Sequence, residues 1–336
     1  MQRRVRLGLL IVLGLSGFAA VGACRRETPA APEDTSATPS PSPASRPLTV
    51  AFVQVGAESA WRTAETRSIQ TEAGKRPGIE LKFFDAQQKQ ENQIRGLKSF
   101  VAQDVDVIVL APVVETGWEP ALREAKEAGI PVVLVDRGVN VTDESLYTTL
   151  IASDFVEEGR IAGRWLAEKT GGKCSIVELQ GTVGAAPAID RKKGFEEIIA
   201  QHPEMKIIKS QSGDFTRAGG KQVMEAFIKA EGRNIQAVYA HNDDMAIGAI
   251  QALKDAGMKP GQDVLVISID AVRAAFEAMI AGELNATVEC SPLFGPLLFD
   301  TIAKIVAGEP VPKKIINQDR LFEPHEAAAL IDSREY

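Results

Sequence analysis

The sequence contains few of the residues from which metal centres and disulfide frameworks are built. Its 336 residues include three cysteines and three histidines, and no two histidines stand at metal-ligand spacing. It also lacks the phosphate-binding loop of nucleotide hydrolases, the Gly-x-Gly-x-x-Gly fingerprint of dinucleotide-binding domains and the Gly-x-Ser-x-Gly elbow of hydrolases. We therefore expect a protein that is not an enzyme and that carries no metal and no other cofactor.

The remaining histidine and cysteine signals are weak. His241 stands beside two acidic residues, which on its own is a poor indication of a metal site. Cys174 and Cys290 are far apart in the sequence, so two alternatives stay open. They form a disulfide in an oxidising compartment, or they are two buried free thiols.

An excess of basic residues is also missing. The formal net charge is −7, whereas a nucleic-acid partner requires a basic face. After the N-terminal segment, no apolar run approaches the length of a membrane span. We expect no nucleic-acid partner.

The N-terminus has the pattern of a targeting segment. Arg3, Arg4 and Arg6 precede an apolar run over 7–21, and small residues then lead to Cys24. This pattern predicts a lipoprotein signal peptide over 1–23, with Cys24 lipidated and the protein anchored to a membrane without spanning it. The alternative is an ordinary signal peptide that is cleaved after a small residue, with Cys24 incidental.

A segment rich in Pro, Ser, Ala and Thr follows over 24–47. It shows no apolar periodicity and cannot bury enough surface to offset the entropy of ordering, so we interpret it as a flexible tether. About 290 residues remain, which suits two domains.

From residue 48 onward, short β-rich runs alternate with amphipathic helical segments, which predicts parallel sheets covered by helices. The expected strands span 48–55, 79–84, 105–110, 132–135, 175–179, 207–211, 237–240, 264–269 and 286–289. One unit of strand, helix, Gly stop and strand appears twice, and it ends in Asp136 the first time and in Asp270 the second.

The repeat predicts two Rossmann-like lobes that face each other across a cleft. We expect the chain to pass between them near 151–153 and again near 289–292. The predicted N-terminal lobe comprises 48–152 and 291–318, and the C-terminal lobe comprises 153–290 and 319–336. Ligands of open α/β sheets bind beyond the carboxyl ends of the strands, so the loops there are the candidate site.

Two loops of the first half carry such candidates. Asp136 and Arg137 follow a fully apolar strand and offer acceptors and a rigid fork of donors to a polyhydroxylated ligand. Glu58, Trp61 and Arg62 follow the first strand, where an indole can stack on a sugar face. The alternatives are that Asp136 caps a turn with Arg137 in a surface ion pair, and that Trp61 begins the buried stripe of its helix.

The second half supplies comparable loops. Arg191 lies near a helix start, Phe215 follows a strand within Asp-Phe-Thr-Arg, Asn242 follows the next strand, and Asp270 ends another. Asn242 also fits a helix N-cap, a role that does not exclude ligand contact. Residues 190–193 can equally form a solvated helix face.

Long stretches of the chain resemble the ribose-binding-like (type I, cluster B) periplasmic sugar-binding proteins of ABC importers, especially the members that bind galactofuranose. The resemblance covers residue 48 to about 312 and is carried by 54–66, 87–93, 177–184, 189–195, 211–217 and 239–245. It implies two lobes joined by a three-stranded hinge and a sugar bound between them. By position, it implies ligand contacts from Glu58, Trp61, Arg62, Asp136, Arg137, Arg191, Phe215, Asn242 and Asp270.

Three features depart from the ribose-binding pattern. Ala111 precedes Pro112 where ribose binders carry Asn, Cys290 stands in place of a hinge Gln, and Trp61 with Arg62 replaces a pair of aromatics. These differences argue against ribopyranose and are compatible with galactofuranose or a related hexose.

The resemblance therefore implies a monomeric, non-catalytic receptor in the cell envelope, on the periplasmic or extracytoplasmic side, that delivers a monosaccharide to a membrane permease. One alternative is a sensor that presents the closed clamp to a sensor kinase or chemoreceptor. A sugar-responsive transcription factor would need a DNA-binding motif where the signal sequence stands. An enzyme acting on the sugar would have to turn it over.

Overall fold

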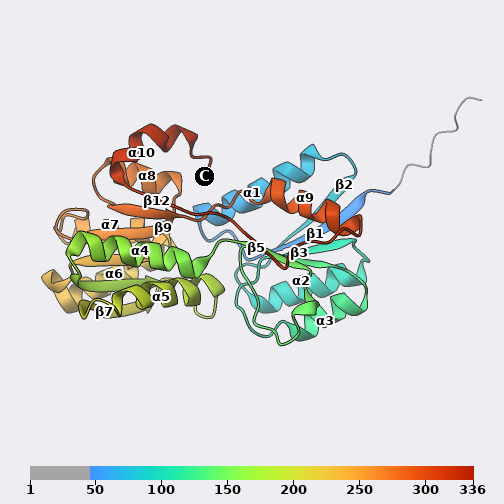
Figure 1. The fold of residues 1–336 in the computed structure, drawn as a ribbon, viewed down its shortest axis with the longest axis horizontal. Helices are drawn as coiled ribbons and strands as arrows, with labels where there is room; N and C mark the ends of the chain where they lie inside the picture. Colours follow the sequence, from blue (N-terminus) through green and yellow to red (C-terminus); the bar gives the residue numbers. More distant parts are fainter. Residues whose placement is uncertain (1–45) are drawn as a thin grey trace, which may run out of the picture. The chain divides into compact units, whose positions relative to one another are not determined.

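The computed structural model describes residues 46–336, which form two six-stranded sheets flanked by helices (Figure 1). The predicted signal peptide (1–23), the lipidation of Cys24 and nearly all of the predicted tether (24–47) lie outside the described residues. At the start of the described part, Arg46 Nη2 pairs with Asp106 Oδ1 at 2.5 Å.

The first sheet is entirely parallel and has the strand order β11-β5-β4-β3-β1-β2. Its strands are β1 (Leu48–Gln54), β2 (Ile79–Asp85), β3 (Val107–Leu110), β4 (Val132–Val135), β5 (Thr149–Ala152) and β11 (Lys314–Ile316). This sheet and the helices packed on it are called the N-lobe below.

The second sheet has the order β12-β10-β9-β8-β6-β7 and is parallel except for its antiparallel edge pair β10–β12. Its strands are β6 (Lys173–Gln180), β7 (Glu204–Ser212), β8 (Ala237–Ala240), β9 (Leu265–Asp270), β10 (Ala286–Glu289) and β12 (Leu321–Phe322). This sheet and its helices are the C-lobe.

Helices connect the strands and cover the sheets (Figure 1). The α-helices are α1 (Ala60–Lys75), α2 (Gln90–Ala102), α3 (Glu119–Glu127), α4 (Phe155–Thr170), α5 (Ala186–Ile199), α6 (Arg217–Glu231), α7 (Asp243–Asp255), α8 (Arg273–Ile280), α9 (Gly295–Val306) and α10 (Pro324–Leu330). Short 3₁₀ turns lie at η1 (Glu144–Leu146), η2 (Gly232–Asn234) and η3 (Ile331–Ser333).

The central strands form because their apolar runs are buried on both faces. All four residues of β3, β4 and β8 are buried, which is the pattern expected of a parallel sheet covered by helices. Each of the nine expected strands is present, with ends that differ by no more than a few residues. The predicted fold class is confirmed.

Three strands were not expected from the sequence, namely β5, β11 and β12. The edge strands β11 and β12 are only three and two residues long and are partly exposed. Stretches this short show no hydrophobic alternation, so their pairing partners, and not their own residues, decide that they form strands.

The chain crosses between the lobes three times. It passes from β5 in the N-lobe to α4 and β6, returns from β10 through α9 to β11, and crosses again from β11 to β12. These crossings form the three-stranded hinge of the predicted fold. The exact lobe boundaries stay a prediction.

Candidate functional site

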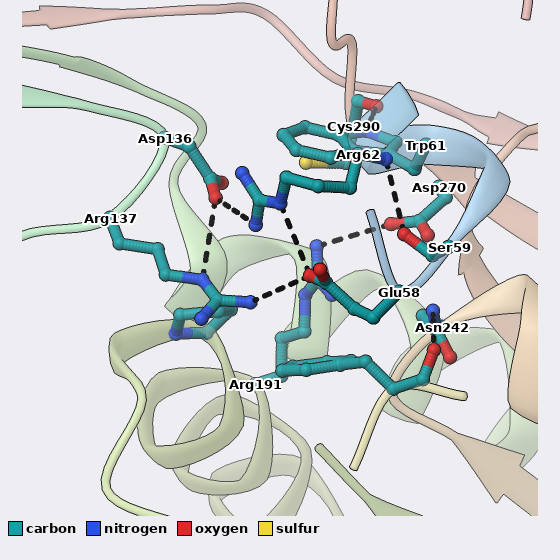
Figure 2. Close-up of a pocket in the computed structure, with 12 residues that line it drawn as sticks. Glu58, Ser59, Trp61, Arg62, Asp136, Arg137, Arg191, Asn242, Asp270 and Cys290 are labelled. Carbon is teal, nitrogen blue, oxygen red and sulfur yellow. Dashed lines mark hydrogen bonds and ion pairs between the residues drawn. The ribbon is translucent and has the colours of Figure 1, made fainter. Parts of the chain in front are cut away.

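A cavity is lined by residues of both lobes, most of them in or next to loops that follow strands of the two sheets. All nine candidate residues contribute to its lining, and Ser59, Pro187 and Cys290 complete it. Figure 2 shows the acidic and guanidinium side chains converging on one another from several elements. The sequence therefore identified residues that the fold brings together, although their contact with a ligand stays a prediction.

Arg62 is the most densely paired cation of the cavity. α1 begins after the N-cap Ser59, whose side chain accepts a hydrogen bond from the Arg62 amide. The guanidinium then reaches Glu58 (Nε–Oε1, 3.2 Å), Glu65 (Nη1–Oε2, 2.5 Å) and Asp136 (Nη2–Oδ2, 2.7 Å). These carboxylates fix the guanidinium in one orientation, because its fork of donors is rigid.

Glu65 lies behind Arg62 and is fully buried. Burial raises the pKa of its carboxyl to about 7, although Arg62 opposes the shift. Gln54 at the end of β1 donates a hydrogen bond of 2.8 Å to the same carboxylate. Glu65 is thus a supporting group for Arg62. The sequence signal that could have revealed it is its position three residues after Arg62 in one helix.

Asp136 and Arg137 lie immediately beyond β4 and are 4% and 3% exposed. The alternative of a surface ion pair at Arg137 is therefore wrong. Asp136 adopts a left-handed backbone conformation (φ 61°), which turns the chain sharply so that both side chains enter the cavity; Asp tolerates this conformation better than most residues. Figure 2 shows Asp136 between the Arg62 and Arg137 guanidinium groups.

The surroundings of Arg137 disfavour its positive charge. Burial, followed by repulsion from Arg62, lowers the pKa of its guanidinium to about 10. Its Nη1 donates to the Val113 carbonyl at 3.1 Å, and its guanidinium carbon lies 5.3 Å from the centre of the Phe215 ring. Arg137 from the N-lobe therefore contacts an aromatic residue of the C-lobe across the cavity.

Trp61 lies on the buried face of its helix and also lines the cavity, while its stacking on a sugar stays a prediction. Its ring is buried against Phe294 at 6.2 Å between centroids and 71° between planes, as expected for a residue of the helix's buried face. Its indole Nε1 donates to the Cys290 carbonyl at 2.6 Å, and the residue also lines the cavity. Trp61 therefore ties α1 to the hinge segment after β10.

Arg191 from α5 is 3% exposed, so it does not belong to a solvated helix face. Its Nε pairs with Glu158 Oε2 at 2.7 Å, its Nη1 donates to the His241 carbonyl at 2.6 Å, and its Nη2 lies 3.6 Å from Asp270 Oδ1. Lys193, by contrast, is exposed.

Close packing of α4 on α5 places Glu158 against Arg191. A Cβ on Gly159 would lie 2.2 Å from the Arg191 carbonyl oxygen, and one on Gly194 would lie 1.9 Å from the Val156 carbonyl oxygen. Only glycine permits this approach. The sequence analysis did not find Glu158, because its role depends on the contact between two helices.

Asn242 is the N-cap of α7, as one interpretation of the sequence predicted. Its Oδ1 accepts from the Met245 amide and its Nδ2 donates to the Phe215 carbonyl, both at 3.1 Å. Phe215 has φ 60°, and its ring leaves no space beside Gly181, where a Cβ would lie 1.9 Å from Phe215 Cζ. These contacts hold the aromatic ring over the cavity.

Asp270 ends β9 in a strained backbone conformation, with φ 121°, followed by Ala271 at φ 58°. Strained backbone of this kind persists only where the surrounding structure enforces it, and it concentrates at ligand sites. Burial raises the pKa of the Asp270 carboxyl well above its usual range, while Arg191 opposes the shift.

Several buried polar atoms at the site have no hydrogen-bond partner within residues 46–336, among them Glu58 Oε2, Arg137 Nε and Glu158 Oε1. A buried polar group without a partner costs free energy, on the order of 1–3 kcal/mol. Glu58 and Arg137 both line the cavity, and Arg137 Nε lies 3.4 Å from Asp136 Oδ2, so its nearest acceptor is a carboxylate of its own lobe.

The described residues include no cluster of His, Cys, Asp and Glu that could hold a metal ion. His241 is fully buried and its Nε2 lies 3.2 Å from Glu178 Oε1. Burial lowers the pKa of the imidazole, which therefore serves as a neutral partner in the core.

The two cysteines of the described part are both buried and free. The disulfide alternative is therefore wrong, and the alternative of two buried thiols describes the structure. Burial raises the pKa of the Cys174 thiol to about 11. Cys290 lines the cavity, although it was not among the candidate site residues.

Among residues 46–336, no helix has both the length and the apolar character needed to cross a membrane.

Comparison with known proteins identifies the family of this chain. Residues 50–309 match the model of the periplasmic binding protein domain. The galactofuranose-binding protein YtfQ of Escherichia coli (strain K12) is 55% identical over 293 residues, which are 86% of this chain and 92% of that protein.

Solved structures agree with this similarity. The periplasmic binding protein component of the arabinose ABC transporter from Shewanella sp. ANA-3, bound to α- and β-L-arabinofuranose, is 55% identical with a TM-score of 0.83, over 85% of this chain and 95% of that chain. A protein from Mycobacterium smegmatis in complex with β-D-fucofuranose is 50% identical with a TM-score of 0.83, over 86% and 95% of the two chains. The chain belongs to the periplasmic binding protein family.

Proposed function

We propose that this protein is the solute-binding component of an ABC sugar importer and that it captures one neutral monosaccharide in the furanose form, galactofuranose or a related sugar, between its lobes. The observation that supports this most directly is the cavity shared by both sheets, whose lining combines carboxylate acceptors and guanidinium donors from both lobes. Each sugar hydroxyl can donate and accept a hydrogen bond, so it can satisfy both kinds of atom.

Charge pairing within the cavity favours a neutral ligand. Arg62 contacts three carboxylates and Arg191 is paired with Glu158. An acidic sugar would find no unpaired guanidinium there, and it would meet the carboxylates of Asp136 and Asp270. Neutral hydroxyl groups avoid this repulsion and gain charge-assisted hydrogen bonds.

Two aromatic residues supply the apolar part of the site. Trp61 comes from the N-lobe and Phe215 from the C-lobe, and both line the cavity. Aromatic faces pack well on the C–H surface of a sugar ring, while the surrounding charged groups bind its hydroxyls. The relatives named above that bind galactofuranose, arabinofuranose and fucofuranose support a five-membered ring.

Capture and release follow from the two-lobe arrangement. A ligand that contacts both lobes binds the closed state more tightly than the open state and shifts the population toward closure. The closed form then docks on a membrane permease. Since the Shewanella relative is a component of an ABC transporter, import is favoured over the sensor alternative. We also retain the lipid anchor at Cys24, the monomeric state and the lobe boundaries as parts of this proposal.

Isothermal titration calorimetry of residues 46–336 against a panel of neutral sugars tests the proposal. The panel contains D-galactose, L-arabinose, D-fucose and D-ribose, with D-galacturonic acid as the charged counterpart of galactose. We expect binding with 1:1 stoichiometry by at least one of the first three sugars and markedly weaker binding of the acid. No heat from any neutral sugar, or preferential binding of the acid, would refute it.

A further inference from the structure

We propose that Asp244 is a closure latch, a side chain outside the cavity that joins the two lobes directly and strengthens the binding of every ligand by the same factor. Ligand choice then belongs to the cavity residues alone. This inference rests on the sugar-binding function proposed above and adds a positioning residue to it.

The carboxylate of Asp244 bridges two elements of different lobes. Its Oδ2 accepts a hydrogen bond of 2.9 Å from the backbone amide of Ala60, the first residue of α1 in the N-lobe. Its Oδ1 pairs with Arg217 of α6 in its own lobe, at 2.9 Å from Nη2 and 3.2 Å from Nε. Asp244 is 5% exposed and does not line the cavity.

The C-lobe holds this carboxylate in place by itself. α6 and α7 pack so closely that a Cβ on Gly248 would lie 2.1 Å from the Arg217 carbonyl oxygen, and one on Gly220 would lie 2.4 Å from the Met245 carbonyl oxygen. The packing of α6 on α7 therefore places Arg217 beside Asp244 within the C-lobe itself. The acceptor is preorganised, which reduces the entropy lost when the lobes close.

The N-lobe offers a donor that its own helix cannot satisfy. The first amides of a helix have no intrahelical acceptor and carry the positive end of the helix dipole. Ser59 caps the Arg62 amide, and Asp244 accepts from the Ala60 amide. A carboxylate is the acceptor best suited to this position, and it arrives only when the C-lobe is close to α1.

The neighbouring acid, Asp243, has a different role, because its partners all lie within its own lobe. Asp243 is fully buried and accepts from Ser268, from the Val272 amide at 2.8 Å and from Thr287 at 2.9 Å. All three partners belong to the C-lobe. Asp243 therefore fixes the loop after β9, whereas Asp244 reaches the other lobe.

The expected effect follows from the closing equilibrium. The apparent dissociation constant of a clamp is its intrinsic constant divided by the fraction of binding-competent molecules. A contact made only in the closed state changes that fraction and does not distinguish one ligand from another. Loss of one hydrogen bond to a buried carboxylate should weaken the binding of each sugar by about tenfold.

Two independent substitutions remove the same hydrogen bond. D244A deletes the acceptor. A60P deletes the donor and also places a ring carbon where the amide hydrogen points at Asp244 Oδ2, 2.9 Å from the nitrogen; proline itself is well tolerated at the first position of a helix. Ser59, the residue before it, already has the extended backbone (φ −140°, ψ 163°) that a following proline requires. D255A is the control, since Asp255 lies on the same helix and pairs with Lys221 of its own lobe at 2.8 Å.

The test measures the affinities of D244A, A60P, the double variant and D255A for at least two neutral sugars by calorimetry. We expect D244A to lose about tenfold for both sugars and A60P to lose at least tenfold, because its ring also meets the carboxylate. The double variant should lose no more affinity than A60P alone, and D255A should match the wild type. If D244A does not fold, A60P carries the test.

Three results would overturn the latch. These are unchanged affinity in D244A, a changed ratio between the sugars, and losses that multiply in the double variant. Wild-type protein that binds no sugar of the panel refutes the proposed function and the latch with it. Wild-type protein that binds, together with a D244A variant that binds equally well, refutes the latch alone.

Discussion

Asp136→Asn tests the charge network of the cavity at its most connected acid. Asp136 receives Arg62 Nη2 on Oδ2 at 2.7 Å, and its carboxylate lies 3.4 Å from Arg137 Nε. Asparagine keeps the side-chain volume and tolerates the left-handed conformation of this position (φ 61°). The substitution therefore removes a charge with little change of shape.

The expected loss of affinity follows from the effect of the Asp136 charge on the two neighbouring arginines. Asp136 raises the pKa of Arg137, which burial and Arg62 lower; without that acid, two buried guanidinium groups face each other with one carboxylate fewer between them. A hydrogen bond to a charged group contributes roughly 1.5–3 kcal/mol. Since 1.4 kcal/mol corresponds to a tenfold change in affinity, D136N should weaken sugar binding by roughly 10- to 100-fold.

Calorimetry measures the affinity, and urea unfolding shows that the variant is folded. D104N is a matched control because Asp104 is an exposed acid of the same lobe that also has a left-handed backbone (φ 53°). It should bind like the wild type. A folded D136N protein whose affinity lies within twofold of the wild-type value would refute the reasoning.

Three further predictions concern the packing at Gly181, the protonation of Asp319 and the burial of the two thiols. Gly181→Ala places a Cβ 1.9 Å from Phe215 Cζ, so it should displace the ring and weaken sugar binding at least tenfold in calorimetry. The control Gly74→Ala meets no atom within 4 Å and should bind sugar like the wild type. Equal affinities of the two variants would contradict the packing of Phe215 on Gly181. Burial raises the pKa of Asp319 to about 7, so the folded state keeps a proton that the unfolded state releases near pH 4, and stability falls as pH rises between these values. Asp319→Asn should therefore gain more stability relative to the wild type at pH 8 than at pH 4 in urea unfolding, and an equal difference at both pH values would contradict this. Cys174 and Cys290 are free and buried, so a thiol reagent should leave folded residues 46–336 unmodified and titrate two thiols after denaturation; rapid labelling of the folded protein would contradict the burial.

The sequence was most informative where one strand carried its own signal. The residues of β4 are all apolar and buried, and the acid and guanidinium that follow mark its carboxyl end. Parallel topology then brings such ends to one edge of each sheet. The same logic located the loops after β1, β8 and β9, so the candidate residues of both lobes could be proposed together before any contact between them was known.

Features that depend on pairs of distant elements were not predictable in this way. The position of Glu158 behind Arg191 requires α4 and α5 to meet at Gly159 and Gly194. Cys290 reaches the cavity because the hinge brings the segment after β10 against Trp61. No local pattern encodes such contacts, since they arise from the packing of complete lobes.

The backbone conformation of the site could not be predicted from the sequence either. An aspartate in a left-handed conformation, as at Asp136, is an allowed deviation, but Phe215 at φ 60° is an unfavourable one. The surrounding structure imposes that conformation, through the contact with Gly181 and the hydrogen bond from Asn242. The sequence placed Phe215 in a loop after a strand and gave no sign of this backbone conformation.

The central claim is that the cavity holds a neutral sugar as a five-membered ring. Carbon-13 NMR of a sugar labelled at its anomeric carbon and bound to residues 46–336 tests it most directly, because furanose and pyranose rings differ in the chemical shift of that carbon. We expect the bound signal to be that of the furanose, and we expect D136N to give a weaker bound signal at equal concentrations of protein and sugar. A bound signal from the pyranose alone would contradict it.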